Sequence, residues 1–114
     1  VKKIVFLSGK IFYDLNKRKK ELKNEDTVLI RLEQLYPFPK RKIQAIIKKY
    51  NKAKEYIWAQ EEPENMGAWS FVLQNLGKLI NIKLVSRRLS AAPASGSSKK
   101  FSKRQELILN KIFN

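Results

Sequence analysis

The sequence predicts an α/β protein, a three-layer α/β/α sandwich in which helices cover both faces of a mostly parallel sheet. Short apolar runs alternate along the chain with stretches whose apolar residues recur at helical spacing. The first three runs are nearly continuous, which is typical of strands that are buried on both faces. A strand-helix order repeated four times, joined by right-handed crossovers, gives this architecture.

Four apolar runs are predicted to be strands. The fourth run is interrupted by Lys83, and an extra short strand at Arg87–Leu89 or near Ala91 is an alternative. In order, the runs are Ile4–Leu7, Val28–Ile30, Tyr56–Ala59 and Ile82–Val85.

Four segments between and after these runs carry the apolar face of a helix. Pro39 suits the first turn of the second helix, because its missing N–H is not needed there. Gly77 lies near the end of the third helix, where the chain must turn back. The predicted faces consist of Ile11, Leu15 and Leu22; of Ile43, Ile46, Ile47 and Tyr50; of Trp69, Val72, Leu73, Leu76 and Ile80; and of Leu107, Ile108, Ile112 and Phe113.

Composition restricts the class of protein. The hydrophobic fraction of 43% is too high for a disordered chain, and 114 residues suffice for one domain with a core. No apolar run approaches the roughly 20 residues of a membrane span. The chain has no cysteine and no histidine, which excludes disulfides, thiol nucleophiles, Ser-His triads and the usual zinc sites. This composition fits a cytoplasmic protein.

The start of the chain already has the pattern of a strand, with no initiator methionine and no signal peptide. We therefore expect residues 1–114 to form a single domain of a longer polypeptide.

The net charge of +15 allows two interpretations. Lysines spread along the chain are typical of a generic solvated surface, whereas a polyanion site would gather them. The alternative function is a small basic nucleic-acid-binding module that uses Lys17–Lys20, Lys99 and Lys100. No nucleic-acid motif is present, and aromatic residues are not interleaved with the basic runs. A third interpretation is a receiver-like or nucleotide-binding domain. The sequence lacks the acidic cluster or glycine fingerprint that such a domain needs. We expect neither a nucleic-acid nor a membrane partner.

Polar residues follow each predicted strand, and the carboxyl ends of parallel strands are where ligands bind in such sheets. Polar strand ends are also common without a function. The Ser8–Lys10 turn is interpreted as a plain tight turn rather than an anion site. The four groups are Ser8, Gly9 and Lys10; Arg31, Glu33 and Gln34; Gln60, Glu61 and Glu62; and Ser86, Arg87 and Arg88.

The neighbouring acids Glu61 and Glu62 are a poor acid-base pair, because adjacent residues of an extended chain point to opposite sides. We expect a structural role instead. One carboxylate is expected to cap the helix that starts near Met66, and the other to contact Lys10 or Arg87.

The loop Leu35–Pro39 is aromatic and stiffened by prolines. Tyr36 and Phe38 either form an exposed interface patch or cover the end of the local core. Arg41 and Lys42 follow at the start of a helix, where they form either a solvated face or a phosphate site.

Four of these motifs, taken together and in order, resemble one known family. Their spacing and the length of chain that they span make the resemblance far more specific than any single motif. It is to the C-terminal domain of the thiamine-diphosphate-dependent component of 2-oxoglutarate dehydrogenase, and it implies a transketolase C-terminal-like fold. The motifs are SGKIFYDL (Ser8–Leu15), IRLEQLYPFP (Ile30–Pro39), QEEPENMGAW (Gln60–Trp69) and SRRLSAAPASGSS (Ser86–Ser98).

The resemblance implies a function for the complete enzyme rather than for this segment alone. The complete enzyme decarboxylates 2-oxoglutarate in the tricarboxylic acid cycle and passes the succinyl group to the lipoyl arm of dihydrolipoyl succinyltransferase. Thiamine diphosphate and magnesium bind mainly in the preceding domains. This segment is then a non-catalytic domain that supports a homodimer and contacts the remaining domains of its own chain.

The resemblance also implies an allosteric site for acetyl-CoA or AMP in some relatives. The matching residues here are Gln34, Arg41 and Lys42, with lysine at a position where one relative pattern has arginine. Lysine keeps the charge but loses the bidentate fork. The residues assigned to structural or interface roles are Lys10, Glu61, Glu62, Trp69, Arg87 and Arg88.

Overall fold

The computed structural model describes residues 1–87 and 98–113, with side chains for all of these except 87 and 98–104. Strands and helices alternate throughout, as predicted. The strands are β1 (Lys3–Leu7), β2 (Thr27–Arg31), β3 (Glu55–Pro63) and β4 (Ile82–Arg87). The helices are α1 (Ile11–Glu21), α2 (Lys40–Lys49), α3 (Trp69–Leu76) and α4 (Ser98–Phe113).

The four strands form one sheet in the order β2-β1-β3-β4, and all three neighbouring pairs are parallel. The register places Val5 of β1 opposite Leu29 of β2 and Ile57 of β3. Because all strands run the same way, their carboxyl ends meet at one edge of the domain. This edge collects the polar groups predicted to matter.

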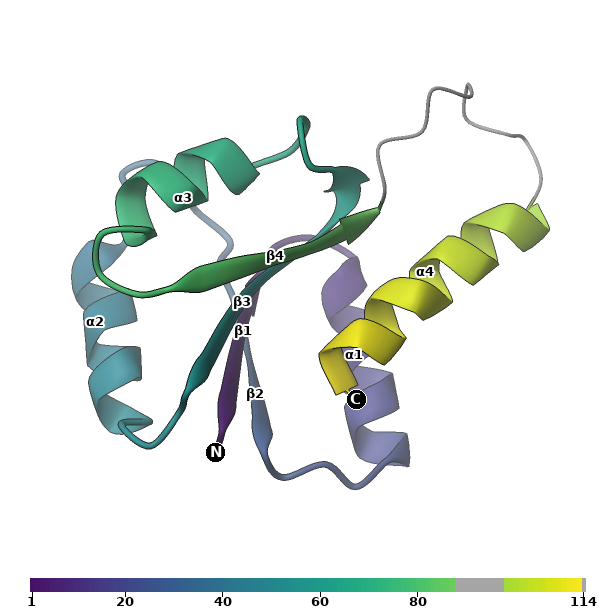
Figure 1. The fold of residues 1–114 in the computed structure, drawn as a ribbon, viewed down its shortest axis with the longest axis horizontal. Coiled ribbons are helices and arrows are strands. Elements are labelled where there is room, and N and C mark those ends of the chain that lie inside the picture. Colours follow the sequence, from purple (N-terminus) through teal and green to yellow (C-terminus); the bar gives the residue numbers. More distant parts are fainter. Residues whose placement is uncertain (88–97, 114) are drawn as a thin grey trace.

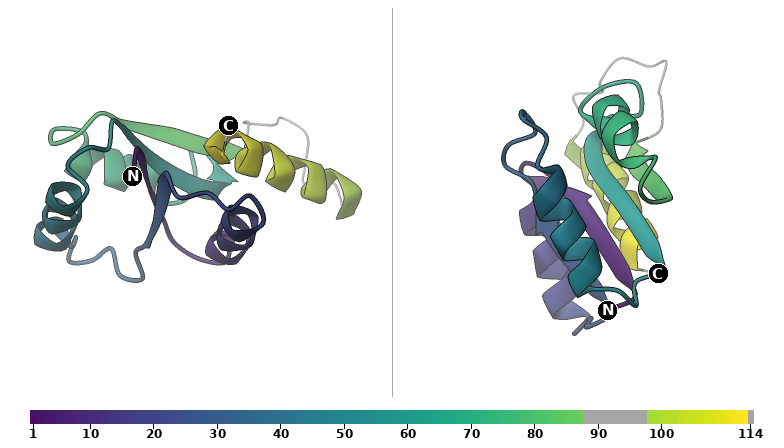
Figure 2. Two further views of the ribbon diagram at one scale, coloured as in Figure 1. Left: turned by 90° about the horizontal axis from the view of Figure 1, so that it is seen from below. Right: turned by 90° about the vertical axis from the view of Figure 1, so that its left-hand side faces the viewer.

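Helices cover both faces of the sheet, which confirms the predicted α/β/α sandwich (Figures 1 and 2). Ile4 and Phe6 of β1 pack with α2 and α3 on one face, whereas Val5 and Leu7 pack with α1 and α4 on the other. All four side chains are fully buried. Each such burial contributes roughly 1.5–3 kcal/mol, so β1 anchors both layers of the core.

Three leucines predicted to face the core are exposed instead. Leu22 is the C-cap of α1, so it lies beyond the helical face, and its side chain is 53% exposed. Leu73 keeps the helical spacing to Trp69 and Leu76 yet is 44% exposed, and Leu107, next to the buried Ile108, is 61% exposed. Tertiary packing chooses one side of each helix, and these leucines fall on its border.

Strands β3 and β4 are longer than predicted. Gln60, Glu61 and Glu62 lie within β3 rather than after it, and Ser86 and Arg87 lie within β4. The pairing of these strands shifts register between Ala59 and Pro63, so β3 bulges there. The alternative strand at Arg87–Leu89 or Ala91 lies outside the described residues, except that Arg87 itself belongs to β4.

None of the helices in the described part of the chain combines the length and the apolarity that crossing a bilayer requires.

Candidate functional site

The side-chain amide of Gln60 organises the chain at the end of β3, at the edge of the sheet where the carboxyl ends of the strands meet. Its side chain is only 3% exposed, yet it is polar. Its Oε1 accepts a hydrogen bond from Trp58 Nε1 at 2.9 Å. Its Nε2 donates to the carbonyl oxygens of Glu62 at 3.1 Å, Pro63 at 2.9 Å and Met66 at 2.9 Å. Since the amide carries only two N–H bonds, the three carbonyls share them. One buried amide therefore fixes the following turn onto the core.

Gly67 completes this turn, which we call the Gln60–Gly67 turn. Its φ of +72° lies in the left-handed region that glycine adopts freely. A Cβ at this position would approach Glu62 Oε2 to 3.0 Å and Gln60 Oε1 to 3.1 Å. The glycine is thus required both by its backbone conformation and by the side chains that pack against it.

Of the two contacts predicted for Glu61 and Glu62, the helix cap is wrong and the ion pair is described only in part. The N-cap of α3 is Ala68, and no side chain caps the helix, so the expected carboxylate cap is wrong. Both acids lie within β3, which ends at Pro63, and neither caps the first turn of α3. Among the described side chains, no ion pair joins either acid to Lys10, which is exposed.

The remaining residues predicted for structural or interface roles are only partly described. Trp69 begins α3 and is 9% exposed, within the core cluster between the sheet and α2 and α3. The side chain of Arg87 and the whole of Arg88 lie outside the described residues. Their assigned contacts therefore stay predictions.

A cavity of about 420 Å³ lies beside the end of β2 and the start of α2, and we call it the β2 cavity. It brings Gln34 and Lys42 together, as the effector prediction requires. Arg41 is exposed and is not among the lining residues. The full lining comprises Arg31, Leu32, Glu33, Gln34, Pro37, Phe38, Pro39 and Lys42.

Arg31 is the lining residue whose function the sequence did not reveal. Its guanidinium carbon lies 5.4 Å from the ring centroid of Phe12 and 5.1 Å from that of Tyr13. One terminal nitrogen donates to the Tyr13 hydroxyl at 3.2 Å, and Nε lies 2.8 Å from Glu33 Oε1. The hydrogen bond to Tyr13 and the nearby Glu33 carboxylate raise the pKa of Arg31 above its usual value, despite partial desolvation. The guanidinium is a fixed, permanent cation.

An aromatic cluster of Tyr36, Phe38 and Phe71 joins the loop before α2 to α3. The ring centroids of Tyr36 and Phe71 are 4.3 Å apart, and those of Phe38 and Phe71 are 5.7 Å apart in an edge-to-face contact. Phe38 packs against the core, whereas Tyr36 is 68% exposed. Gln34 Nε2 donates to the Tyr36 carbonyl at 2.7 Å and ties this loop to the β2 cavity. Phe38 thus covers the end of the core, whereas the interface role of the exposed Tyr36 stays a prediction.

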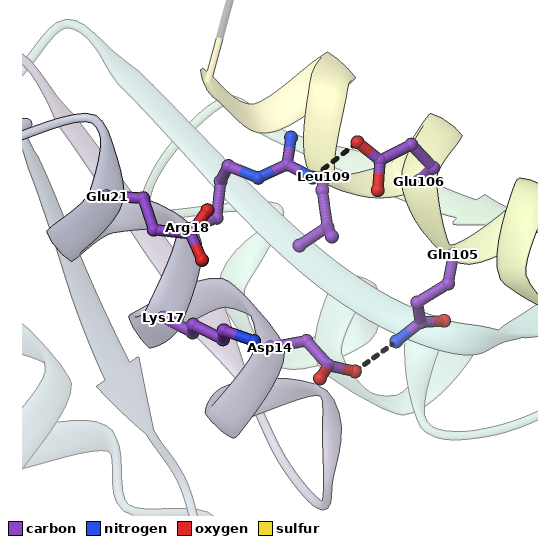
Figure 3. A pocket seen from close by; sticks show the side chains of 7 residues that line it. All are labelled: Asp14, Lys17, Arg18, Glu21, Gln105, Glu106 and Leu109. Carbon is purple, nitrogen blue, oxygen red and sulfur yellow. Dashed lines mark hydrogen bonds and ion pairs between the residues drawn. The ribbon is translucent and has the colours of Figure 1, made fainter.

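A second groove, of about 320 Å³, separates α1 from α4 on the other face of the sheet (Figure 3). Gln105 Nε2 donates to Asp14 Oδ2 at 3.0 Å across it. Arg18 forms an ion pair with Glu106 and donates to Asn110 Oδ1 at 3.1 Å. We call these contacts the α1–α4 clasp, because they hold the last helix against the first.

The family of this chain follows from comparison with known proteins. Residues 1–113 match the family described as 2-oxoglutarate dehydrogenase C-terminal. The chain belongs to this family. It is 44% identical, over 96% of its length, to the 2-oxoglutarate dehydrogenase E1 component of Rickettsia typhi. It is 42% identical, over 99% of its length, to the protein of the same name from Cupriavidus necator.

This 2-oxoglutarate dehydrogenase C-terminal chain spans a small part of these relatives, 12% of the length of each. It also aligns with 9% of a multifunctional 2-oxoglutarate metabolism enzyme from Mycolicibacterium vanbaalenii, at 43% identity over 98% of this chain. Among solved structures, it superposes on a split-gene transketolase, titled an inactive β4 tetramer, with a TM-score of 0.69. That match covers 98% of this chain and 38% of the transketolase chain at 12% identity, and it shows the fold alone.

Proposed function

We propose that residues 1–114 are the single C-terminal domain of a 2-oxoglutarate dehydrogenase E1 component. The supporting observation is more than 40% identity, over nearly the whole chain, to proteins of that name. In this proposal, the complete cytoplasmic enzyme decarboxylates 2-oxoglutarate and transfers the succinyl group to the lipoyl arm of dihydrolipoyl succinyltransferase. The reaction belongs to the tricarboxylic acid cycle.

We assign thiamine diphosphate and Mg²⁺ to other parts of the enzyme. Mg²⁺ needs oxygen ligands gathered in octahedral geometry. Within residues 1–87 and 98–113, no three His, Cys, Asp or Glu side chains are placed to hold a metal ion. In this proposal, the domain contributes no step through the cofactor.

The domain's own role in this proposal is to support the assembly. The exposed Tyr36 ring of the aromatic cluster gives an apolar surface suited to packing against the remaining domains or the dimer partner. The backbone of the Gln60–Gly67 turn is held by the buried Gln60 amide. Lys10, Glu61, Glu62, Arg87 and Arg88 are assigned to the contacts at this edge, and Trp69 anchors α3 beneath them.

The β2 cavity is the proposed effector site for acetyl-CoA or AMP. Its volume of about 420 Å³ is in the range of small-molecule sites. Gln34 and Lys42 offer an amide and a cation to it, and Arg41 adds a second cation at the exposed start of α2. The cations and the N-terminus of the helix both favour phosphate groups.

The enzymatic assignment is tested with the full-length protein that contains this chain. We expect release of CO₂ from 2-oxoglutarate when thiamine diphosphate and Mg²⁺ are added, and no release by residues 1–114 alone. Pyruvate serves as the control substrate. A full-length protein that decarboxylates pyruvate but not 2-oxoglutarate would reject the assignment.

The effector assignment is tested by calorimetric titration of the same protein with acetyl-CoA. Binding is expected, and Arg41→Ala is expected to weaken it because one phosphate partner is lost. Lys48→Ala, on the exposed far end of α2, is the matched control. Equal affinity of the Arg41→Ala and wild-type proteins would remove Arg41 from the site.

A further inference from the structure

The β2 cavity contains a cation that is already paired with a carboxylate from the same strand end. Arg31 is the last residue of β2, and Glu33 follows two residues later in the loop beyond the strand. Arg31 Nε lies 2.8 Å from Glu33 Oε1. The Glu33 side chain is 73% exposed, whereas that of Arg31 is 31% exposed. The carboxylate is therefore the more solvent-exposed partner of the pair.

The pair is an ionic contact without a good hydrogen bond. Arg31 Nε is buried and has no hydrogen-bond partner, although the carboxylate oxygen is within reach. The N–H bond therefore does not point at that oxygen. A buried donor without an acceptor is unfavourable, so an anion that meets the N–H in line would be preferred over Glu33.

The guanidinium itself is held independently of Glu33. The rings of Phe12 and Tyr13 lie against it, and the Tyr13 hydroxyl accepts one of its hydrogen bonds. These contacts come from α1, so they persist when the carboxylate leaves. A planar guanidinium with a fixed orientation matches the oxygens of a phosphate.

The other walls of the cavity fit a ligand with a phosphate and a less polar body. Lys42 adds a second cation and Gln34 an amide, whereas Phe38 and two prolines form apolar walls. Arg31, Glu33 and Lys42 are the charged groups that line it, so the cavity becomes more positive when Glu33 turns away.

We propose that Glu33 occupies the anion position of the β2 cavity in the free protein, and that a phosphate-bearing ligand displaces it to bind the Arg31 guanidinium. This inference rests on the proposed effector function and deepens it. It identifies phosphate as the group that is recognised, Arg31 as its anchor and Glu33 as an internal competitor.

The test is calorimetric titration of the full-length protein with AMP, with acetyl-CoA in a parallel arm and with adenosine as the uncharged control. The wild-type protein is expected to bind AMP or acetyl-CoA, and adenosine far more weakly. Glu33→Gln removes the competitor and is expected to tighten binding about 3- to 10-fold. Arg31→Met removes the anchor and is expected to weaken binding about 10-fold or more.

The Arg18–Glu106 pair of the α1–α4 clasp provides matched controls, because it joins the same residue types away from the β2 cavity. Arg18→Met and Glu106→Gln are expected to leave the affinity within about twofold of wild type. Glu33→Gln keeps the ring contacts of Arg31, so it tests the inference even if Arg31→Met fails to fold.

The outcomes separate this inference from the effector function. If the wild-type protein binds AMP or acetyl-CoA and both cavity variants bind equally well, the displacement of Glu33 is overturned while the effector function stands. Adenosine binding as tight as AMP binding would also overturn it, because phosphate would then not be recognised. If neither ligand binds at about 1 mM, the effector function itself is rejected.

Discussion

The Gln60–Gly67 turn and the β2 cavity both lie at the carboxyl edge of the same sheet. They differ in whether their buried polar group has its hydrogen bonds. The Gln60 amide is buried and fully hydrogen-bonded to its own chain. Arg31 Nε is buried without a hydrogen bond beside an exposed carboxylate. A satisfied buried group stabilises the fold, whereas the unsatisfied Nε of Arg31 is the group that our proposal assigns to a ligand.

The largest effect on stability is expected at the centre of the turn. Gln60→Ala leaves Trp58 Nε1 and the turn carbonyls without partners, and each unpaired buried group costs about 1–3 kcal/mol. We expect a loss of about 3–5 kcal/mol in the free energy of unfolding, measured by urea denaturation of the 114-residue chain. Gln44→Ala, exposed on α2, is the control and should change stability by less than about 0.5 kcal/mol. Equal stabilities would show that the buried amide does not hold the turn.

A smaller effect is expected at the end of the same turn. Gly67→Ala combines a positive φ with close contacts to Glu62 and Gln60, and we expect a loss of about 2 kcal/mol. Gly9→Ala is the matched control, since its φ of +82° is similar but a Cβ there would meet nothing within 4 Å. It should cost only about 1 kcal/mol. The same urea denaturation experiments measure both, and a Gly9 variant less stable than the Gly67 variant would argue against the packing.

The smallest effect on stability is expected beside the β2 cavity. Tyr13→Phe removes the hydroxyl that accepts from Arg31 but keeps the ring contact, so the unfolding midpoint should shift less than in Gly9→Ala. Arg31 is charged in both the folded and the unfolded chain at neutral pH, because arginine stays protonated far above pH 7 and the folded contacts only raise its pKa further. Stability from a raised cation pKa is lost only as the pH rises through the folded value.

The shift caused by Tyr13→Phe should therefore be constant between about pH 5 and pH 9, well below the titration of arginine. Thermal melts at the two ends of this range measure it. A shift that grows several-fold between them would mean that another group controls the contact.

The contrast between the two regions also explains what the sequence could reveal. The strand and helix order and the two-sided sheet follow from apolar runs such as Ile4–Leu7, because burial alone decides them. The extent of β3 and its final turn could not be predicted in the same way. Gln60 is polar, and its hydrogen-bond partners come together only through the bulge and the turn.

The candidate site was predictable only in part. Gln34 and Lys42 were selected by resemblance, and the fold brings both to one cavity. Arg31 was seen only as a polar residue at a strand end, since Tyr13, which orients it, lies in the preceding helix and meets it only in the folded chain. A sequence pattern does not show that a buried N–H lacks a hydrogen bond, or that an aromatic ring from another helix lies against a guanidinium.

The central claim is that this edge supports the enzyme and binds ligands but makes no bonds in the reaction. The most direct test is kcat for 2-oxoglutarate decarboxylation by the full-length protein that carries Glu61→Gln and Glu62→Gln together. Our account predicts a kcat within about threefold of wild type, because neither carboxylate takes part in the chemistry. A fall of about a thousandfold or more, in a protein that still folds, would make these acids catalytic and contradict it.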